Sequence, residues 1–394
     1  MSLLSKLVAT SLICFWINFL RADSFSWIQS PSLKQRFDDS PFGHGDRPAP
    51  ALLAIVYLWG DIRSTRSNTY SFLQASIRHL VVNAPSSNFS SSPILVLQTI
   101  QAQVLLSLYY MYAALPAQGR HYASAAASLA LTAGLHRLHA PPLSPQPPFA
   151  LSRAAPILPP PADLIDAAVR NAAFWAVVIV NNCWIATQGS PSAISYSIPI
   201  ETPWPGGTRA GSTISKFLNG HDSDGFTSIA LLAKASTLVE RIVSAGARIS
   251  GIDPTAFNTL GQRLNEFYML LPPLAYPVEP DRALLLAHGL TLFAIIQLHA
   301  PPRGARVRVR AAADTISKIL QDVASSGMAP DPNPVLPATT AAAVYVHDIN
   351  ASHVASQEHR EARDSLSRLI RSMRQLCSDS PVMQLCLETI SATT

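Results

Sequence analysis

The spacing of apolar residues has the period of an α-helix in nearly every long segment, and the alternation typical of β-strands is almost absent. We therefore expect an all-α fold: a large multi-helix, bundle-like regulatory domain with Pro-rich connecting loops. The pattern predicts helices over 51–59, 70–82, 94–115, 119–135, 163–188, 226–249, 254–271, 281–298, 311–325 and 339–346, and then a closing helix.

The closing helix has the clearest amphipathic pattern. Its apolar stripe follows 4-3-4-3 spacing, with Arg360, Arg363, Asp364, Arg368, Arg371 and Arg374 on its other faces; the stripe consists of Ala362, Leu366, Leu369, Met373 and Leu376. A coiled coil needs three or four heptads, and this stripe covers about two. We expect it to pack on the body of the same domain, and a homodimer is the alternative.

Proline and glycine divide the chain without separating domains. Residues 141–161 contain nine prolines, which no regular helix accommodates, so 139–161 is predicted to be a Pro-rich loop. Residues 189–220 form a second irregular stretch. We expect one helical domain over 1–394, in which 206–394 is the C-terminal helical part.

The composition is apolar, with 48% hydrophobic and 13% charged residues, against about 25% charged in an average domain. It excludes a disordered chain. A membrane-spanning helix needs about 20 apolar residues, and the best candidate, 283–298, contains polar positions typical of a buried core helix. Residues 7–20 follow Lys6 and leave a signal peptide or membrane anchor as an alternative, although Asn18 and the lack of a small-residue cleavage pattern favour an ordinary first helix.

The net charge of +5 arises from 29 basic and 24 acidic residues. Binding to nucleic acid requires clustered cations that neutralise several phosphates, and the only dense cluster is Arg303, Arg306, Arg308 and Arg310. It is a weak localisation or phosphate-binding signal, and a solvated helix start is the favoured interpretation.

Motifs for catalysis are absent, so we expect no enzyme, no catalytic residue and no cofactor-binding residue. Neither Gly-rich phosphate-binding loop occurs. The Gly-Ser-Pro-Ser segment at 189–192 lacks the second glycine of a nucleophile elbow. Asp163 and Asp166 are more simply the acidic first turn of a helix than a metal-binding pair.

No metal site is expected in this chain. His347, His353 and His359 are spaced six and six, and His136 and His139 three apart, which match no recognised ligand spacing. The four cysteines, Cys14, Cys183, Cys377 and Cys386, are too few for a six-cysteine zinc cluster and too scattered for a disulfide framework, which favours a reducing compartment.

Two stretches carry more information. Residues 100–138 read IQAQVLLSLYYMYAALPAQGRHYASAAASLALTAGLHRL, and residues 171–205 read NAAFWAVVIVNNCWIATQGSPSAISYSIPIETPWP. The first contains a Gly-Leu-His-Arg turn at Gly134, Leu135, His136 and Arg137. The second contains a Gly-x-Pro-Ser turn at Gly189, Pro191 and Ser192 and a Pro-rich exit around Trp204. With PALLAIVYLWG at 50–60, the chain over 48–205 resembles the fungal-specific transcription factor domain, the middle homology region of fungal zinc-cluster regulators.

The resemblance implies a regulatory domain of an RNA polymerase II transcription factor, effector-responsive or autoinhibitory, located in the nucleus. Its implied partners are the transcription machinery or co-regulators and a small-molecule effector. No association with a membrane is implied. In that family zinc and DNA are bound by a separate N-terminal zinc cluster, which this sequence lacks. DNA binding and zinc are therefore expected only through a missing cluster.

An apolar pocket could be lined by Phe174, Trp175 and Trp184 of the central aromatic helix, with Tyr109 supplying a polar tip. Ordinary core packing of these rings is the favoured interpretation. A pocket would also fit the alternative function, a helical small-molecule-binding protein or enzyme of unrelated class.

Overall fold

The chain folds into helices and connecting turns. The computed structural model describes residues 49–63, 69–83, 93–138, 158–188, 192–208, 211, 213–247, 254–274, 281–299, 305–325, 336–376 and 381–392. Within these residues there is no strand, and the all-α prediction is confirmed. Residues 1–48, with the segment 7–20, and most of the Pro-rich loop lie outside the described residues.

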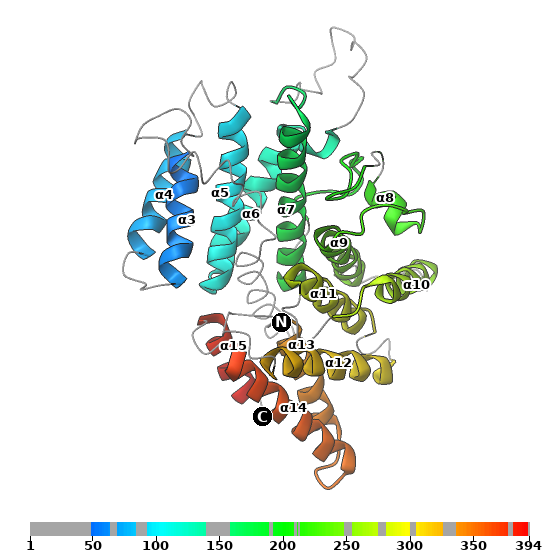
Figure 1. Ribbon diagram of the computed structural model, residues 1–394. Helices are drawn as coiled ribbons and strands as arrows, with labels where there is room; N and C mark the ends of the chain where they lie inside the picture. Colours follow the sequence, from blue (N-terminus) through cyan, green and yellow to red (C-terminus); the bar gives the residue numbers. More distant parts are fainter. Residues whose placement is uncertain are drawn as a thin grey trace.

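The helices follow the predicted order (Figure 1). The first half contains α3 (Pro50–Arg63), α4 (Thr69–Asn83), α5 (Pro93–Tyr112), α6 (Pro116–Thr132), the 3-10 turn η2 (Leu135–Arg137) and α7 (Leu164–Gln188). The second half contains α8 (Thr213–Leu218), α9 (Ser228–Ala247), α10 (Pro254–Leu270), α11 (Arg282–His299), α12 (Arg306–Ser325), α13 (Leu336–Ala351), α14 (Gln357–Leu376) and α15 (Pro381–Ser391).

Several helix bounds differ from the prediction by a few residues, and two helices were not expected; three of these differences have a clear reason. The segment expected to be irregular over 189–220 contains α8, whose six residues are too few to display a helical period. α15 follows the helix that was expected to close the chain. α12 begins at Arg306 rather than at 311, because its first turn is largely charged and adds little to an apolar pattern.

The start of α7 is confirmed. The carboxylate of Asp163 accepts a hydrogen bond from the Asp166 backbone at 2.7 Å, as a helix-capping side chain does. Asp166 in turn binds the buried Arg170 through two hydrogen bonds of 2.8 and 2.7 Å. Both acidic residues therefore stabilise the helix terminus.

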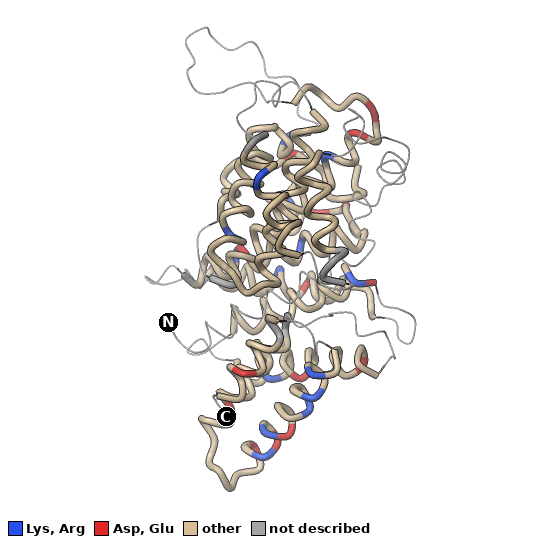
Figure 2. Tube along the Cα trace, turned by 90° about the vertical axis from the view of Figure 1, so that its left-hand side faces the viewer, with Lys and Arg blue, Asp and Glu red and all other residues tan. Residues whose placement is uncertain are grey.

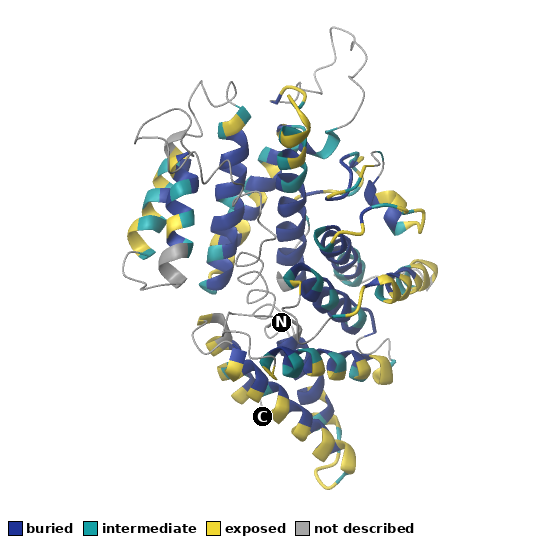
Figure 3. Cartoon of the chain, in the orientation of Figure 1, coloured by how far each residue is buried: buried dark blue, intermediate teal, exposed yellow. Residues whose placement is uncertain are grey.

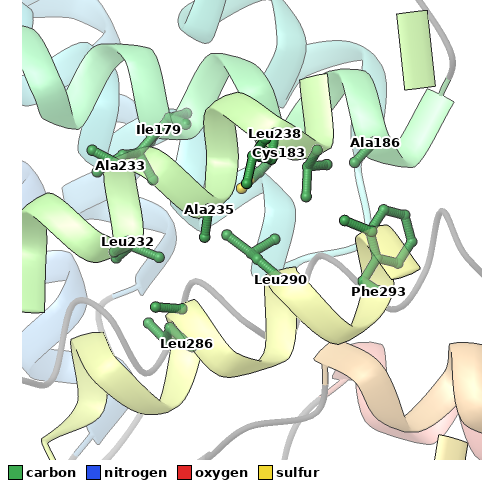
Figure 4. Packing of buried hydrophobic residues seen from close by; sticks show 14 of the residues in the cluster. Ile179, Cys183, Ala186, Leu232, Ala233, Ala235, Leu238, Leu286, Leu290 and Phe293 are labelled. Atoms are coloured by element: carbon green, nitrogen blue, oxygen red, sulfur yellow. The ribbon is translucent and has the colours of Figure 1, made fainter. Parts of the chain in front are cut away.

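One large hydrophobic core extends from α5 to α15. α7 stands upright in the middle, with α9 and α11 beside it and α12 to α15 below (Figure 1). In the close-up of Figure 4, Cys183 of α7, Leu238 of α9 and Leu290 of α11 lie in one packed layer. Because residues of both halves share this core, the C-terminal helices stabilise the motif-bearing part.

The helix α5 has two buried faces. Val104 and Leu108 belong to the large core, whereas Leu105 and Tyr110 belong to a smaller cluster formed with α3 and α4. Figure 3 shows α5 and α7 dark blue along most of their length, and yellow, exposed positions on α4, α10 and α14.

Three helices have the length and apolar composition to cross a membrane: α5, α7 over 164–186, and α11. The sequence pattern gave 283–298, within α11, as the best candidate, and α5 and α7 have the length and composition as well. Between 56% and 78% of each apolar window is buried within the fold, so neighbouring helices cover much of this apolar surface.

The amphipathic prediction for α14 is confirmed. All five residues of its apolar stripe are buried, and the helix packs on α12 and α13 of the same chain. Figure 2 shows basic and acidic residues alternating along α14, whereas the helices above it are mostly uncharged. Nothing in the single chain tests the homodimer.

Candidate functional site

The Gly-Leu-His-Arg motif forms the turn that ends α6. Gly134 has a φ of 79°, in the left-handed region, and its backbone N–H donates to Leu131 O at 3.0 Å. Glycine is the usual residue at this position because it carries no Cβ to clash there. The turn places Leu135 in the core and leaves His136 and Arg137 at the helix end.

This turn binds directly to the exit of the second motif block. The backbone N–H groups of Glu201 and Thr202 donate to His136 O at 2.8 and 3.2 Å. The Thr202 hydroxyl donates to Leu135 O at 2.5 Å and accepts from the Leu138 N–H at 3.3 Å. Two motifs that lie more than sixty residues apart in the sequence thus form one junction.

An ion pair lies beside these backbone contacts. Arg137 Nε is 3.3 Å from Glu201 Oε2, and the two side chains are 21% and 24% exposed. Ion pairs with this degree of exposure contribute up to about 1 kcal/mol to the stability of the fold. Arg137 is therefore a secondary contact, and the buried Thr202 is the principal side chain of the junction.

The Gly-x-Pro-Ser turn is described only at its end. Gly189 and Pro191 lie outside the described residues, and Ser192 is half-buried. Its hydroxyl accepts from Asn181 Nδ2 at 2.7 Å and donates to Ile194 O at 2.7 Å. Ser192 therefore ties the segment after α7 back onto the last turns of that helix.

Trp204 connects the junction to the centre of the molecule. Its indole stacks on that of Trp175, with ring centroids 4.4 Å apart and an interplanar angle of 27°. Trp175 Nε1 donates to Pro203 O at 2.7 Å. Edge contacts extend the row to Phe217 and Phe267, with centroids 5.6 Å apart at each step.

A buried lysine lies against this aromatic row. Lys234 of α9 is 2% exposed, and its Nζ lies 2.5 Å from Asp222 Oδ2 and 2.6 Å from Asp224 O. It also lies 5.3 Å from the Trp204 ring and 4.9 Å from the Phe226 ring, within cation–π distance. Burial lowers the pKa of Lys234, and the contact with Asp222 opposes that shift.

Trp204 also binds the same carboxylate, because its Nε1 donates to Asp222 Oδ1 at 3.1 Å. Asp222 is therefore shared by an indole and an ammonium in the interior. Thr202, Asp222 and Lys234 were not predicted from the sequence. A single lysine within the otherwise apolar first turns of α9 was a usable signal, because lysine is seldom fully buried without a partner.

The proposed pocket residues are placed in two regions. Phe174, Trp175 and Trp184 are at most 1% exposed in the large core. Trp184 donates to Ser107 Oγ at 2.8 Å and fills the space beside Gly119, where an added Cβ would lie 2.2 Å from its ring. Tyr109 is instead half-buried in the smaller cluster. Its ring lies edge-on to that of Trp59, with the ring centroids 6.3 Å apart. The structure does not bring Tyr109 to the other three rings, which pack as core side chains.

Arg306 and Arg308 are exposed in the first turn of α12, as expected of a solvated helix start, whereas Arg310 is half-buried. Arg306 binds Asp348 at 3.1 Å and Glu358 at 3.7 Å, and Arg310 binds Asp314 and Asp348 at 3.2 and 3.1 Å. Arg303 lies outside the described residues. Acidic neighbours therefore neutralise two of these cations.

Metal ligands do not converge in the part of the chain that the structure describes: no three His, Cys, Asp or Glu side chains are grouped there as a metal site requires. The ring of His359 is buried and contacts Ile349 O and Ser352, while His347 is exposed. Cys183 and Cys386 are buried core residues. They do not fit the ligand set of a zinc cluster.

Comparison with known proteins gives no relative. No protein-family model matches the chain, no curated protein matches it, and no solved structure matches it. The resemblance of residues 48–205 rests on the motif residues alone.

Proposed function

We propose that this chain is the regulatory domain, effector-responsive or autoinhibitory, of a fungal transcription factor of the zinc-cluster family. The observation that supports it is the junction between the two motif blocks. Thr202 joins Leu135 and Leu138 through its hydroxyl, and Arg137 pairs with Glu201. Motif residues of the first block, Leu135 and Arg137, therefore contact Thr202 and Glu201, which lie within the second block.

The junction would serve regulation by fixing how α6, α7 and α9 are arranged. It holds the turn after α6 against the exit segment, and Trp204 holds that segment against α7 and α9. A ligand or partner that shifts one of these helices would change the others through a continuous set of packed side chains.

The remaining family properties are part of the proposal. The protein would act in the nucleus through the transcription machinery or co-regulators. The four cysteines of this chain do not provide a zinc cluster, so DNA binding would require a cluster outside this sequence.

A reporter assay tests the proposal. The full chain is fused to a heterologous DNA-binding module in a fungal host and compared with that module alone over several nutrient conditions. We expect a change in reporter output in at least one condition. An unchanged output in every condition, with the fusion detected in the nucleus, would contradict the proposal.

A pair of variants makes the assay specific for the junction. Arg137→Glu should alter the regulated output, and adding Glu201→Arg should restore it, because the ion pair is re-formed with reversed charges. Arg371→Glu, an exposed charge reversal on α14, is the matched control and should leave the output unchanged. Equal effects of Arg137→Glu and Arg371→Glu would count against a role for the junction.

A further inference from the structure

A polar groove lies on the C-terminal helices, away from the aromatic row. Its volume is about 400 Å³, and its lining comes from α12, α13 and α14. Three of its lining residues are buried and carry hydroxyl groups: Ser317, Tyr345 and Ser365. The volume falls within the range of small-molecule sites, about 300–1,000 Å³.

The base of the groove is held by a hydrogen-bonded network. Arg310 donates to Asp348 Oδ2 and to Ser365 Oγ, each at 3.1 Å. Tyr345 donates its hydroxyl to Asp314 Oδ1 at 2.8 Å and lies under the Arg310 guanidinium at 4.7 Å. Arg310 is therefore already neutralised, and the base of the groove is preorganised.

The rim of the groove carries four other charges, two of each sign. Lys318 and Arg368 are cationic, Glu361 and Asp364 are anionic, and all four are exposed. Among the described residues, none of the four lies within ion-pair distance of an opposite charge. In the part of the chain that the structure describes, Arg368 donates to Ser365 Oγ at 3.1 Å, and Glu361 accepts from the Gln357 amide at 2.8 Å.

The helical spacing explains why these charges share the groove. Positions 310, 314, 318 and 321 of α12 recur every three or four residues and lie on one face, and so do 361, 364, 365 and 368 of α14. Because α12 packs against α14, the two polar faces meet across the groove. A ligand that carries both signs would complement the charges of both kinds.

We propose that this groove binds a small zwitterion with a carboxylate and an ammonium group, of the class of the free α-amino acids. The ligand carboxylate would bind Lys318 and Arg368, and its ammonium would bind Asp364 and Glu361. A simple anion would face the two carboxylates of the rim, and a simple cation would face its two basic groups. The Ser317 and Ser365 hydroxyls would bind a polar side chain of the ligand. The inference does not depend on the proposed transcriptional role.

Calorimetric titration of the full chain tests this site. The probes are the twenty free L-amino acids, followed by the N-acetyl and carboxamide forms of the one that binds best. We expect binding of one molecule per chain and an affinity about tenfold weaker for each form that lacks one charge, as expected when one ion contact is removed. Absence of binding by all twenty at 10 mM would overturn the proposal.

Variants assign the two ends of the ligand. Asp364→Asn should weaken binding of the free amino acid about tenfold and leave binding of the N-acetyl form unchanged. Lys318→Gln should also weaken binding of the free amino acid about tenfold, and it should leave binding of the carboxamide form unchanged. Arg371→Gln, on the exposed face of α14 outside the groove, should bind like the unaltered chain. Equal affinity for the free and N-acetyl forms would instead identify an anion site, and unchanged binding in both groove variants would place the ligand elsewhere; either result overturns the proposal.

Discussion

The ammonium group of Lys234 and the carboxylate of Asp222 lie 2.5 Å apart inside the molecule, with their side chains 2% and 8% exposed. The same carboxylate binds the Trp204 indole, which stacks on Trp175 of the central helix. One buried charge pair therefore joins α9, the segment before it and the second sequence motif.

Breaking this pair should be strongly destabilising. Asp222→Asn leaves the Lys234 ammonium without its carboxylate, and we expect it to lower the free energy of unfolding by about 3–5 kcal/mol in urea denaturation. The double variant Asp222→Leu with Lys234→Met removes both charges and should recover most of that loss. If Asp222→Asn lowered the free energy of unfolding by less than about 1 kcal/mol, Asp224 O and the aromatic rings would be sufficient to stabilise the buried Lys234 ammonium without the carboxylate.

The Thr202 hydroxyl should be needed for stability as well. Thr202→Val keeps the shape of the side chain but leaves Leu135 O without its donor and the Leu138 N–H without its acceptor. We expect a loss of about 1–3 kcal/mol in the free energy of unfolding. Thr259→Val on the exposed face of α10, whose hydroxyl also donates to a backbone carbonyl, is the matched control and should change stability by less than about 0.5 kcal/mol.

Two glycine-to-alanine substitutions should have opposite signs. Gly134→Ala places a Cβ at a left-handed φ of 79° and should cost about 1–2 kcal/mol of stability. Gly261 lies within α10, where an added Cβ meets Leu298 only at an ordinary 3.5 Å, so Gly261→Ala should stabilise the chain by about 0.5–1 kcal/mol. Thermal unfolding of both variants measures the difference, and a neutral Gly134→Ala would contradict the capping role of that turn.

Acid should weaken the start of α7. Burial raises the pKa of Asp166, but the hydrogen bonds from Arg170 and from the Ala162 backbone outweigh it and hold that pKa below its ordinary value. Asp166 has a lower pKa in the folded chain than in the unfolded chain, so its carboxylate stabilises the fold. This stabilisation is complete above the unfolded pKa and is lost as the pH falls through the folded pKa. Asp166→Asn should therefore reduce the pH dependence of stability below pH 4, measured by urea denaturation at several pH values. An identical pH profile in the variant would contradict this assignment.

Local patterns were sufficient to predict most of the helices. The stripe of α14 and the buried helix α7 follow from a period that the sequence displays directly. α8 was missed because six residues do not complete two turns. The contact of Thr202 with Leu135 could not be predicted, since it is a hydrogen bond between segments that no local pattern relates. The groove was missed for the same reason: each helix shows charged positions, but only packing places Lys318 and Asp364 around one cavity.

The two buried faces of α5 have a consequence for how the molecule opens. The pair of helices α3 and α4 contacts the rest of the described chain chiefly through α5, by way of Leu52, Ile55 and Leu58 and the 2.6 Å hydrogen bond from the Ala49 N–H to Gln98 Oε1. A unit attached along one face can separate without exposing the large core, so amide hydrogens of α3 and α4 should exchange through a partial opening well below the global unfolding free energy. Amides of α5 facing α7 should exchange only on complete unfolding, which makes this helix the boundary between two cooperative units.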